Sequence, residues 1–385
     1  MKASILAVGT ELTTGQIINK NAAILSEKLK AFGVQTHSHL TIADDRKVIL
    51  DSLNYLALGA DILFVTGGLG PTSDDFTRDV ISDWSQKPLR FDEASWLHIV
   101  ERLSSRGLTV RDMQRQQCYF PEGATILHNS DGTAHGFQLT VKITDQLKTI
   151  FVLPGPPREI EAIWKDHLIT WLTKNTQGLD KITTQAWDTL GVGESDIAYA
   201  VENALGQKPE NFFEIGYRVH LPYVEVKLSY LESEKNMWQS WIEKVDAALK
   251  PYTITKDFED VARLVTQALK TIDFTFYDYV SNGYLHARLS PLLKSLKKWS
   301  FKQNYASDIT ADFFDDEDQF LALFPYAEDQ CVILFSINGH RTMKTVEAPM
   351  KSPLMQERRQ QFFAEMALVE IGKSLNAKPR GLNGL

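Results

Sequence analysis

The feature that most constrains this chain is a short buried strand that ends in a glycine-rich loop. Residues 61–65 read DILFV, and the residues that follow read TGGLGPTSDD. The segment before the strand, residues 46–58, carries apolar side chains at helical spacing, and residues 76–84 can form a helix after the loop. This alternation of helix, strand, glycine-rich turn and helix predicts a βαβ fold with a mostly parallel sheet.

The same rhythm runs through the first 173 residues. Ser4–Val8 is an apolar run that ends at Gly9, and residues 149–153 form another that ends in the sequence PGPP. Helical patterns cover residues 19–32 and the segment after Pro157, a residue that suits the first turn of a helix. We therefore predict an α/β domain over residues 1–173, with a sheet covered by helices on both faces.

Two further domains are expected, because 385 residues exceed what one core usually supports. The polar stretch 174–180 predicts a linker. Residues 181–252 show a β-α-β-β-α order, typical of a small α+β domain, and residues 256–385 form a third, α/β unit. In that unit the dipeptide Asn338-Gly339 separates two apolar runs and predicts a hairpin. The acidic run Asp312–Asp318 fits no metal-ligand spacing, so an exposed loop is expected there.

Composition excludes several classes of function. The net charge of -8 gives no general attraction to nucleic acid or to anionic membranes. Cys118 and Cys331 lie far apart, so neither a zinc motif nor a disulfide framework is present. No apolar run approaches the length of a membrane span, and the N-terminus reads as a strand and not as a signal peptide. We expect a cytoplasmic protein.

Acidic and glycine-rich loops follow the predicted strands, at the edge where open α/β sheets bind ligands. Successive backbone N–H groups in such loops can hold phosphate oxygens. Carboxylates beside them would repel an anion unless a divalent cation lies between, as Mg²⁺ does when it is held by one or two carboxylates and by phosphate oxygens. The alternative is that Asp74 caps the following helix and that Asp75 favours its dipole. The glycine-rich loop favours the ligand site.

The order of motifs closely resembles the CinA (competence/damage-inducible) family. The matching stretches are AVGTELTTGQIINKNAAILSEKL, IADDR, VTGGLGPTSDDFTRD, PEGATILHNSDGTAHGFQL and VLPGPPREIEAIW. The resemblance implies a MogA/MoaB-like three-layer N-terminal domain, a small KH-like middle domain and a homodimer. It also implies hydrolysis of ADP-ribose or a related nucleotide diphosphate with a divalent metal (magnesium, manganese or cobalt).

Carried over from the family, the site residues fall into three groups. The catalytic candidates are Glu11, Asp44 and Asp75, and the metal candidates are Asp74 and Asp75. The substrate-binding candidates are Thr10, Asn21, Gly67, Gly68, Gly70, Pro71, Thr72, Gly132, Thr133, Gly155 and Pro156. The chain departs from the family pattern at Leu12-Thr13, usually two leucines, and at His135, usually proline. A lone loop histidine such as His135 is expected to be solvated and is a weak candidate base.

The C-terminal third departs further from the family. There the family often carries a nicotinamide-nucleotide amidase whose nucleophilic serine lies in a Glu-Ser-Cys-Thr-Gly-Gly motif. The best alignment places residues 278–283, DYVSNG, on that motif, so Tyr279 occupies the nucleophile position. A phenol cannot replace that serine, and lost glycines remove the tight backbone. We therefore expect a degenerate amidase-like domain without nicotinamide mononucleotide deamidase activity.

Two other functions remain open. The glycine-rich loop would equally serve a molybdopterin-type cofactor, as in better-known relatives of the fold. Because the third domain is expected to have lost its activity, the protein could also be a non-catalytic nucleotide-binding or regulatory protein.

Overall fold

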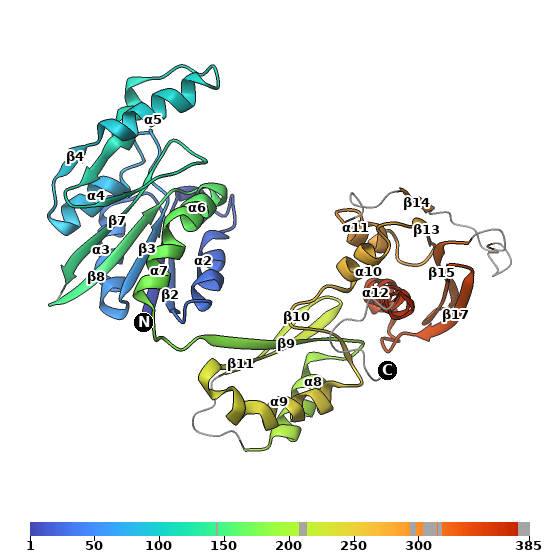
Figure 1. The fold of residues 1–385 in the computed structure, drawn as a ribbon. Helices are drawn as coiled ribbons and strands as arrows, with labels where there is room; N and C mark the ends of the chain where they lie inside the picture. Colours follow the sequence, from blue (N-terminus) through green and yellow to red (C-terminus); the bar gives the residue numbers. More distant parts are fainter. Residues whose placement is uncertain (144, 208–213, 293–297, 303–313, 315–317, 376–385) are drawn as a thin grey trace. The chain divides into compact units, whose positions relative to one another are not determined.

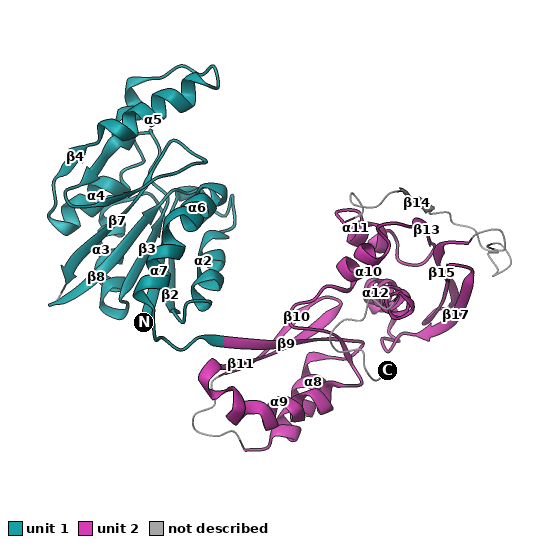
Figure 2. Ribbon diagram, viewed as in Figure 1, with its two compact units in different colours: residues 1–182 teal, residues 183–385 magenta. Residues whose placement is uncertain are grey.

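The computed structural model describes residues 1–385 except 144, 208–213, 293–297, 303–313, 315–317 and 376–385. The chain forms two compact units, residues 1–182 and 183–385 (Figure 2). Among the helices of the described ranges, none has both the length and the apolar character needed to cross a membrane.

The first unit is built on one six-stranded sheet (Figure 1). Parallel pairs join β1 to β2, β1 to β3 and β3 to β8, whereas β7 and β6 extend the β8 side in antiparallel fashion. The mostly parallel sheet expected from the sequence is therefore confirmed. In spatial order the strands are β2 (Gln35–Ile42), β1 (Lys2–Val8), β3 (Ile62–Thr66), β8 (Gln146–Leu153), β7 (Gly136–Ile143) and β6 (Thr125–Leu127).

Helices cover both faces of this sheet, which gives three layers. On one face, Ile49 and Leu53 of α3 and Ile81 of α4 join a core with Leu63 and Val65 of β3. On the other face, Phe64 of β3 and Phe151 of β8 stack with ring centroids 5.2 Å apart beneath α2, α6 and α7. The helices are α1 (Thr10–Thr13), α2 (Asn21–Lys30), α3 (Arg46–Gly59), α4 (Thr77–Ser85), α5 (Glu93–Ser104), α6 (Pro157–Ile163) and α7 (Ile169–Asn175). A two-stranded ribbon adds β4 (Leu89–Phe91) and β5 (Tyr119–Pro121).

The second unit begins with a four-stranded sheet in the order β10, β11, β9, β12. Helices α8 and α9 pack on one of its faces through Ile197, Val201 and Trp238. The expected β-α-β-β-α order is confirmed, and one strand that the sequence did not suggest, β12, pairs with β9. The elements are β9 (Ile182–Leu190), α8 (Glu194–Leu205), β10 (Glu214–His220), β11 (Tyr223–Leu231), α9 (Lys235–Leu249) and β12 (Thr253–Lys256).

A five-stranded sheet with helices follows in the same unit. The predicted hairpin is confirmed, since Ile337 pairs with His340 and both turn residues, Asn338 and Gly339, have positive φ. Helix α11 spans Tyr284–Leu289, and residues 293–297 lie outside the described ranges. Most of the acidic run Asp312–Asp318 also lies outside them. The elements are α10 (Val261–Ala268), β13 (Asp273–Asp278), α11 (Tyr284–Leu289), β14 (Lys298–Lys302), β15 (Phe320–Ala327), β16 (Gln330–Ile337), β17 (His340–Glu347) and α12 (Gln356–Ser374).

Candidate functional site

A cavity of about 570 Å³ lies in the first unit, where the parallel strands β1, β3 and β8 end. Ligands of open α/β sheets bind at this edge. Most of the site residues expected from the sequence line it, whereas Thr10, Thr72 and Gly132 do not. The lining residues from that set are Glu11, Asn21, Asp44, Gly67, Gly68, Gly70, Pro71, Asp74, Asp75, Thr133, Gly155 and Pro156.

The loop after β3 can be built only with glycine at its first position. Gly67 has φ +97°, and a Cβ atom there would lie 2.1 Å from the carbonyl oxygen of Val8. No side chain fits at that distance, so the absence of a Cβ lets the loop pass directly over the end of β1. Gly68 follows with φ +66°. Two successive positive φ angles turn the chain back over the sheet edge.

The carbonyl side of this loop is held by side chains from other elements. Arg78 Nη2 donates to the carbonyl of Leu69 at 2.5 Å, and Gln117 Nε2 donates to the same oxygen at 3.3 Å. Gln116 Nε2 donates to the carbonyls of Gly70 and Thr72 at 3.0 and 2.7 Å. Arg78 and Gln117 are almost fully buried. These contacts fix the peptide planes of the loop.

The N–H side of the loop is left open. Within the described ranges, the N–H groups of Gly68, Leu69 and Gly70 have no hydrogen-bond acceptor, and all three residues line the cavity. Consecutive unpaired N–H groups form a concavity that suits an anion. The phosphate-binding turn expected from the glycines therefore has the required free donors.

Glu11, Asp44, Asp74 and Asp75 are the four acids that the sequence predicted for this site. Two of them are held in place by hydrogen bonds from threonines. Asp44 Oδ2 accepts hydrogen bonds from Thr10 N and Thr10 Oγ1 at 2.7 and 2.9 Å. Asp75 Oδ2 accepts from Thr72 N and Thr72 Oγ1 at 3.0 and 2.5 Å. Thr10 and Thr72 thus orient the carboxylates of the cavity wall. The other oxygen, Oδ1, of each aspartate makes no hydrogen bond within the described part of the chain.

The alternative in which Asp74 caps the following helix is wrong. Helix α4 begins at Thr77, its N-cap is Phe76, and no side chain caps it. Asp75 instead closes the turn 72–75, because its N–H donates to the carbonyl of Thr72 at 3.0 Å. Both carboxylates line the cavity.

The four acids do not form an all-protein metal cage. In the described ranges, no three of them bring their oxygens within 4.8 Å of one another. Mg²⁺ does not need such a cage, since it is usually bound through one or two carboxylates, water and phosphate oxygens. The open Oδ1 atoms of Asp44 and Asp75 fit that mode of binding.

Sequence reasoning missed two charged groups of the cavity wall, Lys20 and Glu159. Lys20 is the only lysine or arginine that lines the cavity among the described residues. Glu159 Oε2 accepts a hydrogen bond from the buried Asn129 Nδ2 at 2.7 Å, and burial raises the pKa of Glu159. A Cβ on Gly132 would lie 2.2 Å from that oxygen, which explains the glycine. Neither residue lies in a glycine-rich turn, so no local pattern pointed to them.

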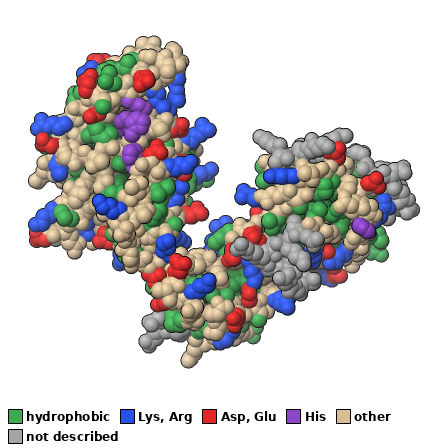
Figure 3. Space-filling view, viewed as in Figure 1, with side chains coloured by type: hydrophobic (Ala, Val, Ile, Leu, Met, Phe, Trp, Pro, Cys, Tyr) green, Lys and Arg blue, Asp and Glu red, His purple; other side chains and the backbone are tan. Residues whose placement is uncertain are grey.

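His135 is buried, which contradicts the expectation of a solvated side chain. Its Nδ1 accepts a hydrogen bond from the backbone N–H of Asn129 at 3.0 Å, and its ring lies 4.5 Å from His98 and 4.6 Å from His128. Figure 3 shows histidines gathered on this unit. Burial and the two neighbouring imidazoles lower the pKa of His135 to about 3. Since Nδ1 accepts, Nε2 keeps the ring proton and does not ligate a metal.

Residues 278–283, which align with the family's amidase motif, form a turn in the second unit. Polar side chains of this turn bond to one another and to its backbone. Tyr279 follows β13, and Ser281 is buried with its hydroxyl donating to Asp278 and accepting from the N–H of Leu285. Asn282 and Gly283 have positive φ, which asparagine and glycine adopt more readily than other residues. The Asp278 carboxylate also accepts from the N–H of Ser281, so the side chains of Asp278 and Ser281 bond to groups of their own segment.

Comparison with known proteins agrees with this architecture. Residues 4–174 match a family model described as "Probable molybdopterin binding domain". A competence-damage inducible protein of Desulforamulus reducens is 32% identical over 303 residues, which cover 76% of this chain and 71% of that protein. The chain belongs to the competence-damage inducible (CinA) family. A CinA relative from Clostridium botulinum is 37% identical over 205 residues, which cover 53% of this chain and 49% of that protein.

Solved structures resemble the N-terminal domain. One is the protein CinA of unknown function from Thermoplasma acidophilum, which is 28% identical in sequence. The aligned region covers 44% of this chain and 96% of the Thermoplasma chain, with a TM-score of 0.39. The tungsten cofactor synthesizing protein MoaB from Pyrococcus furiosus is 19% identical, covers 46% and 97% of the two chains, and has a TM-score of 0.32. The match of residues 4–174 to the molybdopterin-binding family model agrees with the N-terminal domain expected for a CinA-family chain.

Proposed function

We propose that the N-terminal domain hydrolyses ADP-ribose or a related nucleotide diphosphate with a divalent metal. The observation that carries the proposal is the combination of three open N–H groups at Gly68, Leu69 and Gly70 with five carboxylates in one cavity. An anion cradle and a set of acids are compatible only when a cation offsets the charge. Lys20 adds a positive charge on the same wall.

In this proposal the residues of the cavity have different roles. The loop N–H groups and Lys20 would bind phosphate oxygens. Asp44 and Asp75, which Thr10 and Thr72 orient, would hold the metal. A bound divalent ion supplies positive charge that polarises the diphosphate.

Glu11 differs from these aspartates, because its carboxylate has no hydrogen bond in the described part of the chain. A carboxylate without a fixed partner can reach a water molecule and accept its proton, so Glu11 would act as the base. Glu159, which lines the same cavity and whose pKa burial raises, would keep or release a proton there.

Asp75→Asn tests the proposal directly. The variant keeps an oxygen for Thr72 but loses the charge, so turnover of ADP-ribose should fall by about 100-fold or more. Release of AMP would be followed while magnesium, manganese or cobalt is titrated, with Asp145→Asn on the exposed β7–β8 turn as the control. An unchanged rate in Asp75→Asn, or no hydrolysis by the wild type with any of the three metals, would contradict the proposal.

A molybdopterin-type ligand is the second candidate, favoured by the family model that matches residues 4–174. The same N–H cradle would bind its phosphate, but no metal-dependent hydrolysis would follow. Parallel calorimetric titrations with ADP-ribose and a phosphorylated pterin separate the two. Tight binding of ADP-ribose without turnover would instead indicate a regulatory nucleotide-binding protein. A homodimer, as expected for the family, would be measured by light scattering.

A further inference from the structure

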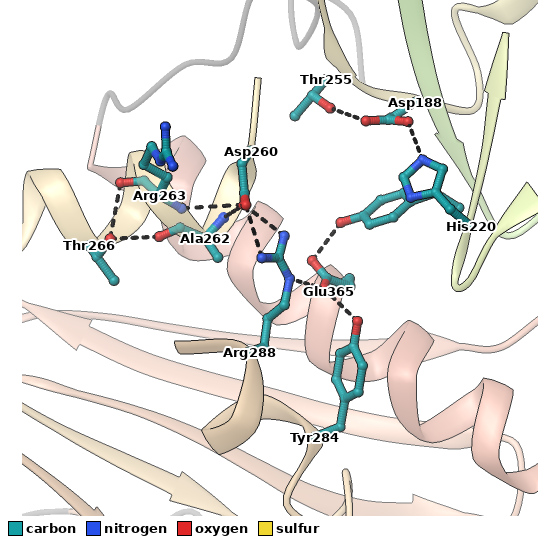
Figure 4. Close-up of polar contacts among 11 residues, drawn as sticks. Asp188, His220, Thr255, Asp260, Ala262, Arg263, Thr266, Tyr284, Arg288 and Glu365 are labelled. Carbon is teal, nitrogen blue, oxygen red and sulfur yellow. Dashed lines mark hydrogen bonds and ion pairs between the residues drawn. The ribbon is translucent and has the colours of Figure 1, made fainter. Parts of the chain in front are cut away.

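A second polar cavity, of about 350 Å³, lies in the second unit and takes no part in the proposed hydrolysis. One wall is the face of the four-stranded sheet that does not carry α8 and α9. The other wall comes from the segment around α10 and α11, including Asp260, Tyr284 and Arg288. Figure 4 shows the polar contacts on both walls.

Three metal-ligand side chains meet on the sheet wall. Asp188 comes from β9, His220 from the end of β10 and Glu225 from β11. One ligand atom of each lies within 4.8 Å of the other two, and His220 Nε2 lies 2.8 Å from Asp188 Oδ1. Ligands on neighbouring strands are held more rigidly than ligands on loops.

From this arrangement we propose that Asp188, His220 and Glu225 form a binding site for a divalent transition metal of the Zn²⁺ class. One imidazole nitrogen and two carboxylate oxygens are borderline ligands of the kind that zinc accepts. Three protein ligands leave a coordination position open toward the cavity. His220 binds as the neutral imidazole through Nε2, and its ring proton moves to Nδ1.

Neighbouring side chains orient Asp188 for metal binding and leave the charge of the three ligands unbalanced by Arg288. Thr255 Oγ1 donates to Asp188 Oδ2 at 3.2 Å and leaves Oδ1 facing His220. On the opposite wall, Arg288 is occupied by Asp260 at 2.7 Å and by the buried Glu365 at 2.8 Å. Tyr223 and Tyr284 also donate to Glu365 (Figure 4). Arg288 is therefore neutralised by its own partners and does not offset the charge of the three ligands.

Lys227 is the group that competes with a metal. Its Nζ lies 2.7 Å from Glu225 Oε2, and its side chain is 32% exposed. Arg218 approaches the same oxygen only to 3.9 Å. In the metal-free protein the ammonium of Lys227 balances the buried Glu225. A metal takes over that charge balance, and the flexible lysine moves into solvent.

Zinc titration of the chelator-stripped full-length chain tests the site by calorimetry. His220→Ala should lose one zinc equivalent, or at least tenfold in affinity, relative to the wild type and to the control His340→Ala on β17. Lys227→Gln should bind zinc several-fold more tightly, because the competing charge is gone. Zinc bound elsewhere cancels in these differences.

Circular dichroism checks that each variant is folded, and Asp188→Asn, which keeps hydrogen-bonding groups for Thr255 and His220, replaces His220→Ala should the latter unfold. Zinc binding in His220→Ala or Asp188→Asn with the number and affinity of sites seen in His340→Ala would overturn the proposal. Unchanged zinc affinity in Lys227→Gln would overturn the role of Lys227.

Discussion

The loop after β3 and the turn after β13 both follow a parallel strand and both contain glycine, yet they differ in what they leave open. In the first, Gly68, Leu69 and Gly70 keep free N–H groups beside a cavity. In the second, Ser281 and Asp278 satisfy each other inside the protein. A binding site needs polar groups that the fold fixes but does not satisfy.

The difference comes from which groups each loop uses for its own stability. Arg78, Gln116 and Gln117 hold the carbonyls of the N-terminal loop, so its N–H groups are not needed for folding. In the turn at 278–283, by contrast, side chains of the turn itself accept the N–H groups of Ser281 and Leu285.

Of the variants considered, Gly67→Ala should disrupt the loop after β3 most strongly. The added Cβ would meet the Val8 carbonyl at 2.1 Å, so we expect about 3 kcal/mol or more of destabilisation and loss of nucleotide binding. Gly178→Ala is the matched control, because it also has positive φ but open space around it. That control should cost only about 1 kcal/mol in urea unfolding. Equal losses in the two variants would show that the close approach to β1 is unimportant.

His135→Asn should change how the stability of the open site depends on pH. The pKa of His135 is lowered to about 3 in the folded protein from an ordinary value of 6.5. Below pH 6.5 the unfolded chain takes up a proton that the folded chain refuses, so stability falls as the pH falls toward 3. The slope from this group reaches about 1.4 kcal/mol per pH unit.

Asparagine can still accept from the N–H of Asn129 but does not titrate. Urea unfolding at pH 7 and pH 5 should therefore show a smaller acid loss in His135→Asn than in the wild type. His340→Asn, at an exposed position, should leave the acid loss unchanged. Parallel acid profiles for wild type and His135→Asn would refute the role of His135.

Glu159→Gln should change the stability of the N-terminal domain by a smaller amount. Because burial raises the folded pKa of Glu159 above 4.5, its ionisation opposes folding once the pH passes that value. Glutamine can still accept from Asn129, so we expect a gain below about 1 kcal/mol at pH 8 that disappears below pH 4. Urea unfolding of Glu101→Gln, exposed on α5, should show no such gain. A loss of stability at pH 8 would mean that the charged form of Glu159 is favoured.

Tyr279→Ser should have the smallest effect, because the closed turn lacks more than the nucleophile. Neither the wild type nor the variant should release ammonia from nicotinamide mononucleotide, since Asn282 and the Ser281–Asp278 bond keep the turn closed. An active amidase of the family serves as the positive control. Ammonia release above the enzyme-free rate in Tyr279→Ser would show that the turn can still form an amidase site.

Local patterns were enough for most of the fold. The parallel βαβ rhythm, the hairpin at Asn338-Gly339 and the order of elements in residues 181–249 all follow from periodicity and turn residues. Strand β12 escaped notice because its four residues, Thr253–Lys256, carry no alternation and depend on pairing with β9. The burial of His135 escaped notice for a similar reason, since its packing against His98 joins two segments that are distant in sequence.

By itself the sequence determined the three-layer N-terminal domain and the strand ends at which a ligand binds, because glycine positions and hydrophobic periodicity are local properties of the chain. Only the tertiary structure decided that the loop's carbonyls are bonded and its N–H groups are free, that Thr10 and Thr72 hold the acids, and that Lys20 and Glu159 share the cavity. Many of these contacts, such as that between Thr10 and Asp44, join atoms from distant parts of the chain, and no residue spacing records those encounters.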